Sequence, residues 1–146
     1  MAIMNALNVS ASGMTAQRLR LDIISQNIAN ASTTRDENGE AYRRKTVLFA
    51  EKDADSASTF SRMLLNKNSG LSETVGNGVR VTAIVEDHVT AMKKVYDPSH
   101  PDADEEGYVT MPNVNTVTEM TNLIDATRSY EANVTAFNAT KNMLLK

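Results

Sequence analysis

The sequence predicts an α+β fold in which two long terminal helices pack as a coiled-coil-like pair, with a small β-containing region and loops between them. Three observations predict this fold. Apolar residues recur every seven positions near each end of the chain, which is the period of a helical seam. All three prolines and five of the six glycines fall between residues 32 and 113. Because both residue types interrupt helices, the middle region cannot continue either helical pattern.

The first predicted helix runs from Ile3 to about Ala31 and contains no proline. At 1.5 Å per residue such a helix would be about 40 Å long. Gly13 is its only glycine and costs about 1 kcal/mol relative to alanine. The apolar heptad positions of this helix are Leu7, Met14, Leu21 and Ile28.

The second predicted helix begins after Pro112 and continues almost to Lys146. Thr116 and Glu119 match the Thr-x-x-Glu capping box, which predicts the helix start at this point. The apolar heptad positions of this helix are Leu123, Tyr130, Phe137 and Leu144.

We expect these eight heptad residues to carry subunit assembly. Full burial of eight such side chains would contribute roughly 10–20 kcal/mol. Ordering the two helices costs more than that, at about 1–2 kcal/mol per residue for the backbone. Neighbouring subunits would then complete the burial, although an ordinary helical pair within a monomer would show the same periodicity.

The middle region predicts a small β-structure. Apolar residues alternate along residues 78–86, which is the pattern of a half-buried strand. Residues 91–96 are its expected partner, and residues 42–49 are a possible third strand. Residues 51–77 are rich in Ser, Asn, Asp and Gly, which predicts a mobile loop with a helical turn at residues 60–65.

The predicted organisation therefore has three parts. Residues 1–33 form an N-terminal assembly helix and turn, residues 34–113 form the middle β/loop region, and residues 114–146 form a C-terminal assembly helix. The first thirteen residues carry no Lys or Arg, and Arg18, Arg20 and Asp22 follow. This pattern is not that of a secretory signal peptide, and no later stretch reaches the length of a membrane span.

Composition excludes several classes of function. The chain has no cysteine, which excludes disulfides and thiol catalysis, and its net charge of −3 does not favour nucleic acid. His88 and His100 read as surface-loop residues, and no nucleophile elbow or phosphate loop occurs. We expect no enzymatic activity, no cofactor, no bound metal and no small-molecule substrate.

Two charged stretches are candidate binding sites. Asp102, Asp104, Glu106 and Gly107 match part of a calcium-binding loop, but Asn113 stands at the position that needs a bidentate carboxylate. A solvated acidic turn is the better interpretation. The basic run 43–45 is either a solvated strand edge or a contact with the acidic turn of a neighbouring subunit.

One segment carries a family resemblance. Residues 21–30 followed by Thr33 resemble the N-terminal signature of bacterial flagellar rod and hook axial proteins. In that family the first helix ends in an Ala-Asn-x-x-Thr motif, which Ala29, Asn30 and Thr33 match. Asn and Thr side chains can bond to local backbone groups and end a helix in a defined turn.

The resemblance extends over nearly the whole chain and is closest to the proximal-rod type. Where many members have a Pro-Gly-Tyr-like stretch, this chain has Thr34 and Arg35, followed by residues 42–45. Further similar segments are residues 78–81, 96–98, 107–109, 112–114, 119–120 and 128–133.

The resemblance implies a structural subunit of the flagellar basal-body rod in the periplasm. Such proteins polymerise with copies of themselves and other rod subunits and transmit torque. They leave the cytoplasm through the flagellar type III export apparatus without a cleavable signal peptide. The residues alone also allow another class of function, a soluble helical binding module or export chaperone. That alternative would be well folded alone, with a fixed small stoichiometry.

Overall fold

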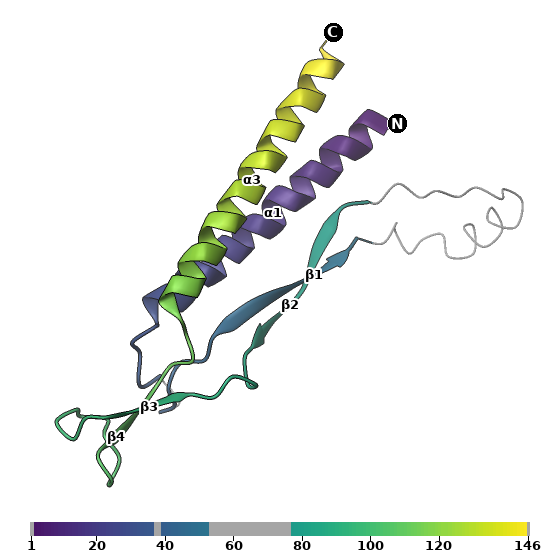
Figure 1. Cartoon of the computed structure of the whole chain (residues 1–146). Helices are drawn as coiled ribbons and strands as arrows, with labels where there is room; N and C mark the ends of the chain where they lie inside the picture. The colour runs from purple at the N-terminus through teal and green to yellow at the C-terminus, as the bar shows by residue number, and fades with distance from the viewer. Residues whose placement is uncertain (1, 37–38, 53–76, 146) are drawn as a thin grey trace, which may run out of the picture.

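A computed structural model describes residues 2–36, 39–52 and 77–145. Its elements are α1 (Ala2–Ala29), β1 (Lys45–Glu51), β2 (Val79–Glu86), β3 (Lys93–Tyr96), β4 (Tyr108–Met111) and α3 (Thr116–Leu144). The two long helices and the antiparallel strand pairs between them confirm the predicted α+β class. Figure 1 shows α1 and α3 side by side in antiparallel directions, the β1–β2 pair beside α1, and the β3–β4 pair at the end away from the chain termini.

Both helices were predicted close to their observed bounds. The predicted capping box of Thr116 and Glu119 was wrong. Asn115 is the N-cap of α3, and its side-chain oxygen accepts hydrogen bonds from the N–H groups of Val117 and Thr118. Asparagine is among the preferred N-cap residues because it satisfies backbone donors that have no partner within the helix. The Glu119 carboxylate is therefore not needed at the cap, and it turns inward instead.

The strand pairing differs from the prediction. Strand β2 pairs with β1, whereas the predicted partner within residues 91–96 is β3, which pairs with β4. Strand β4 was not predicted because it has only four residues and follows an acidic turn. The first strand begins at Lys45 and not at residue 42, since the residues before it bond to the turn after α1.

The β1–β2 ladder contains an irregularity. Leu48 pairs with Ala83 and Phe49 pairs with Val81, so Thr82 lies between two consecutive pairs. An extra residue of this kind bends a strand and increases its twist. The bend lies beside α1, which both strands contact.

The buried apolar side chains are few and come from α1, the segment that leads into β1, and strands β1 and β4 and helix α3. They are Ala16, Ile23, Ile24, Ala41, Tyr42, Val47, Val109 and Ala126. Within the described residues, no helix carries a stretch apolar and long enough to cross a lipid bilayer. Residues 53–76, which include the predicted helical turn at 60–65, lie outside the described part of the chain.

Candidate functional site

The helix pair is the first part of the candidate site. Seven of the eight predicted seam residues are half-buried in the single chain, namely Leu7, Met14, Leu21, Ile28, Leu123, Tyr130 and Phe137. The eighth, Leu144, is 48% exposed. The single chain therefore leaves part of each seam residue uncovered.

The buried positions of α3 follow a different line from the predicted seam. The buried residues of α3 are Glu119 and Ala126, and Asn133 packs against Gly13 of α1. These three positions are also seven apart but precede the predicted heptad by four residues. Small side chains allow the helix axes to approach, whereas the predicted heptad consists only of large, mostly apolar residues. Gly13, whose missing side chain leaves room for Asn133, was the sequence signal for this contact line.

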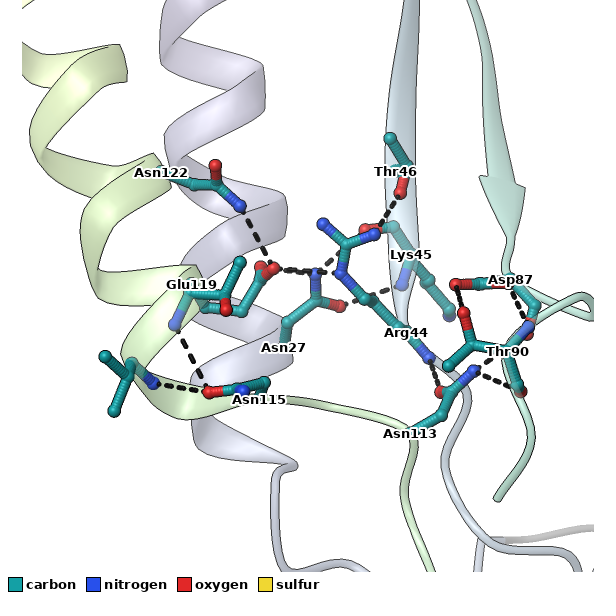
Figure 2. Close-up of polar contacts among 12 residues, drawn as sticks. Asn27, Arg44, Lys45, Thr46, Asp87, Thr90, Asn113, Asn115, Glu119 and Asn122 are labelled. Atoms are coloured by element: carbon teal, nitrogen blue, oxygen red, sulfur yellow. Dashed lines mark hydrogen bonds and ion pairs between the residues drawn. The ribbon is translucent and has the colours of Figure 1, made fainter. Parts of the chain in front are cut away.

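A buried polar junction joins the two helices to the start of β1 (Figure 2). Asn27 of α1 lies at its centre and is fully buried. The Asn27 Nδ2 donates to the Lys45 carbonyl at 2.8 Å, and Asn27 Oδ1 accepts from the Lys45 N–H at 2.9 Å. The amide therefore binds the Lys45 backbone as a neighbouring strand would.

The remaining bonds of Asn27 reach two other segments. Its Nδ2 donates to Glu119 Oε2 at 3.0 Å, and its Oδ1 accepts from the Tyr42 hydroxyl at 2.9 Å. Asn27 thus uses both amide donors and both acceptor positions, as a buried amide requires. Burial raises the pKa of the Tyr42 hydroxyl, and the charges of Glu86 and Glu119 raise it further, so this hydroxyl stays a donor.

Glu119 is the charged member of the junction. Only 1% of its surface is exposed, and Oε1 accepts from Arg44 Nε at 2.9 Å and from Asn122 Nδ2 at 3.3 Å. A buried carboxylate is tolerated only when it is paired and hydrogen-bonded, and both conditions hold here. Arg44 therefore contacts Glu119 within its own chain, so its interpretation as a solvated edge residue was wrong.

Asn113 extends the junction to the next loop. Its Oδ1 accepts from the Arg44 N–H at 2.8 Å, and its Nδ2 donates to the carbonyls of Asp87 and Thr90. Figure 2 shows this side chain between the strand that starts at Lys45 and the 87–90 turn. The junction consequently connects α1, α3 and the middle region. The junction itself was not predicted, because the sequence patterns assign Glu119 to a helix cap, Arg44 to a basic run, Asn113 to a calcium-loop position and Asn27 to the signature of residues 21–30.

The family turn motif lies directly after α1. Ala29 is the last residue of α1, and the Asn30 Nδ2 donates to the Gln26 carbonyl at 2.9 Å. The Thr33 hydroxyl donates to Asn30 Oδ1 at 3.2 Å, and the Thr33 carbonyl accepts from the Tyr42 N–H. This turn returns the chain towards the junction.

The residues of the acidic turn and the two histidines make other contacts. Asp102 accepts from the Thr34 hydroxyl and lies 3.6 Å from Arg35, while Asp104 accepts from the N–H groups of Glu106 and Tyr108. His88 is exposed, and His100 Nδ1 accepts from the Asp102 N–H. Among residues 2–36, 39–52 and 77–145, no three His, Cys, Asp or Glu side chains gather in a way that could hold a metal ion.

Two family profiles match the ends of the chain. The profile described as flagella basal body rod protein matches residues 7–35, and the one described as flagellar basal body rod FlgEFG protein C-terminal matches residues 105–146. The first covers most of α1 and the turn after it, and the second covers α3 and the segment that leads into it.

Full-length relatives carry one description. The chain is 51% identical over 150 residues to the flagellar basal-body rod protein FlgC of Bacillus subtilis (strain 168), covering all of this chain and 96% of the relative. It is 43% identical to FlgC of Borreliella burgdorferi over 98% of this chain and 93% of the relative. It is 38% identical to FlgC of Escherichia coli O6:H1 over all of this chain and 96% of the relative. The chain therefore belongs to the FlgC family of flagellar basal-body rod proteins and is a structural subunit of the basal-body rod.

Proposed function

We propose that this subunit polymerises with copies of itself and with other rod subunits through its terminal helices. It acts in the proximal, periplasmic part of the rod and passes through the flagellar export apparatus without a cleavable signal peptide. Its role is mechanical and not enzymatic. The division into residues 1–33, 34–113 and 114–146 corresponds, in this proposal, to two assembly segments and an outer middle region.

One observation carries the proposal, an apolar stripe on the first turns of α3. Val117, Met120 and Ile124 are 71%, 54% and 51% exposed. Their spacing of three and four residues sets them on one face of the helix, roughly opposite the face that holds Glu119 and Ala126. No requirement of the single chain explains apolar side chains there, whereas an adjacent helix of another subunit would bury them.

The eight seam residues fit the same proposal. Their half-buried state in the single chain leaves apolar surface that a neighbour can cover. Burial of each remaining 40 Å² of apolar surface would contribute about 1 kcal/mol. The sum over many subunits favours an assembled tube over the free chain.

Torque transmission needs a connection between the helices and the middle region, and the polar junction supplies one. Force applied to α1 or α3 reaches β1 through Asn27, Glu119 and Arg44. Directed hydrogen bonds resist sliding better than apolar contacts, because they have preferred angles and distances. The junction therefore supports a rod in which helices and outer regions rotate together.

The test is complementation in a flagellated host whose own copy of the gene is deleted. Hook-basal bodies should be lost on deletion and recovered when this gene is supplied. Met120→Asp should fail to restore them, because a buried unpaired charge costs several kcal/mol. Met120 is exposed in the single chain, so this variant should fold normally by circular dichroism.

Phe137→Asp tests the seam itself, and Asn138→Asp is its exposed neighbour and control. Intact rods with Phe137→Asp would mean that the seam is misplaced. Intact basal bodies in the deletion strain, before any gene is supplied, would overturn the proposed function as a whole.

A further inference from the structure

The tip of the β3–β4 pair presents two aromatic rings to solvent. Tyr96 and Tyr108 form a T-shaped pair with ring centroids 5.3 Å apart and an interplanar angle of 66°. They are nevertheless 64% and 40% exposed. Exposed tyrosines are frequent anchors of protein interfaces, because they bury a large area at a small entropic cost.

The tip is held in one conformation. The Tyr108 N–H donates to Asp104 Oδ1 at 2.8 Å, and the Gly107 N–H donates to the Asp104 carbonyl at 2.9 Å. A Cβ on Gly107 would stand 3.0 Å from the Tyr96 ring, so the missing side chain lets the ring close over the turn. A surface ordered before it binds loses less entropy on binding.

The same tip carries negative charge. Glu105 and Glu106 directly precede Gly107, and both are exposed. Within the described part of the chain, neither carboxylate takes part in an ion pair. The tip therefore combines an aromatic surface with two exposed carboxylates.

A groove elsewhere on the molecule has the complementary character. It lies between α1 and the start of β2, has a volume of about 560 Å³, and includes Leu19, Val79 and Val81 in its lining. Among the described residues, its charged lining consists of the basic Arg18, Lys52 and Arg80 and the acidic Asp22, and Arg80 already takes part in an interaction within the chain. Apolar lining with an excess of positive charge suits an aromatic and acidic occupant.

We propose that the β3–β4 tip of one copy docks into the α1–β2 groove of a neighbouring copy. The tip follows the end of β2 and the groove lies at its start, so the two surfaces are at different places on one molecule (Figure 1). The tyrosine rings cover the aliphatic lining, and Glu105 and Glu106 face Arg18 and Lys52. Contacts between two different surfaces can continue from copy to copy without closing when the rotation between copies does not complete a ring, and a helical rod requires such contacts. This inference rests on the proposed function, since it needs copies of the chain as neighbours in the rod.

The absence of cysteine from the native sequence allows a direct test. Glu105→Cys and Thr15→Cys are made in separate copies of the gene, which are expressed together in the deletion host. Purified hook-basal bodies are treated with a short bifunctional maleimide, and a cross-linked dimer of the two variants is expected. Gln26→Cys, exposed on α1 outside the groove lining, replaces Thr15→Cys as the control and should give no dimer.

Charge reversal gives a second and independent readout. Adding Glu106→Lys to the Glu105→Cys copy should abolish the cross-link, and adding Arg18→Glu to the Thr15→Cys copy should restore it. Assembled rods that contain both single-cysteine variants but no cross-linked dimer would overturn the docking proposal, and the proposed function would stand. Failure of the unmodified gene to restore rods would instead count against the proposed function.

Discussion

The side-chain amide of Asn27 is hydrogen-bonded to both backbone groups of Lys45, at 2.8 and 2.9 Å. A residue of the first helix thereby fixes the residue at which the first strand begins. The same amide reaches Glu119 of the second helix, so three segments distant in sequence meet at one side chain. Junctions of this kind specify one arrangement because any shift leaves buried polar groups without partners.

Replacing Asn27 should therefore be costly. Asn27→Ala removes four hydrogen bonds and leaves the Lys45 backbone and the Tyr42 hydroxyl without these partners. We expect the free energy of unfolding to fall by roughly 3–5 kcal/mol. Urea unfolding of the full chain, followed by circular dichroism, measures it. The control is Asn8→Ala, at an exposed position of α1, which should change the free energy of unfolding by no more than about 0.5 kcal/mol. Similar losses for both variants would contradict the role of Asn27 in the junction.

Neutralising the Glu119 carboxylate should destabilise the fold even when the side chain keeps its size. In Glu119→Gln the new amide loses the ion pair with Arg44 and can turn a donor towards the Asn27 donor. We expect a loss of roughly 2–4 kcal/mol, somewhat below that for breaking a fully buried pair, because Arg44 is partly exposed. Glu131→Gln on an exposed face of α3 should be nearly neutral in the same assay.

A double-mutant cycle with Arg44→Met separates the ion pair from the other contacts of Glu119. The cost of Glu119→Gln should shrink by about 1–3 kcal/mol in the Arg44→Met background, as for other residues in direct contact. Additive effects would show that the carboxylate stabilises the fold through Asn27 and Asn122 alone.

Gly13 permits the close contact between the two helices. A Cβ at this position would stand 2.9 Å from Asn133 Oδ1. Alanine is favoured over glycine in a helix by about 1 kcal/mol, and this contact cancels part of that gain. Gly13→Ala should therefore stabilise the chain more in an Asn133→Ala background than in the native one, by a difference that thermal unfolding can resolve. Equal effects in both backgrounds would show that the helices have room to separate at no cost.

Periodicity predicted the helices because their apolar positions recur at four heptad positions in each helix. This pattern can be read from the local sequence alone. Strand β2 was predicted for the same reason, since Val79, Val81, Ala83 and Val85 alternate. The partner of β2 was mispredicted because pairing depends on which distant segment reaches it. The Asn27–Lys45 bonds hold the start of β1 against α1, and no local pattern reveals them.

The junction residues were not predicted because their burial also depends on contacts between distant segments. Glu119 matched a capping box in sequence, and a cap and a buried ion pair use the same residue type. Asn27 lies next to the heptad residue Ile28 and reads as a polar position beside the seam. Both are polar residues whose burial depends on contacts between α1, β1 and α3, so only the assembled fold distinguishes them from surface residues.

Gly78 should tolerate alanine less well than Gly39. Both glycines have positive φ, 100° and 83°, so alanine at either position costs about 1–2 kcal/mol in backbone conformation. A Cβ on Gly78 would also overlap the Ser12 hydroxyl, which accepts from the Val79 N–H, whereas at Gly39 the nearest atom is 3.9 Å away. Gly78→Ala should cost a further 1–3 kcal/mol or so in urea unfolding. Equal losses of unfolding free energy for the two variants would show that the backbone conformation alone determines both effects, without a contribution from the contact with Ser12.

The Asp87 carboxylate accepts hydrogen bonds from Val89 and Thr90 in the 87–90 turn, and this turn should be less stable in acid. Hydrogen bonds from the backbone N–H and hydroxyl of Thr90 hold the pKa of Asp87 below its ordinary value, and the Val89 N–H and the Arg44 charge lower it further. A folded pKa below the unfolded value of about 3.9 means that the ionised carboxylate stabilises the turn above that pH, and that this stabilisation is lost as the pH falls through the folded pKa. Carbon NMR of the Asp87 carboxyl should give a midpoint below that of an unstructured aspartate, and the Thr90 amide shift should titrate with it. In Asp87→Ala the Thr90 amide should be insensitive to pH over this range. A midpoint at or above the ordinary value would mean that the turn does not depend on the charge.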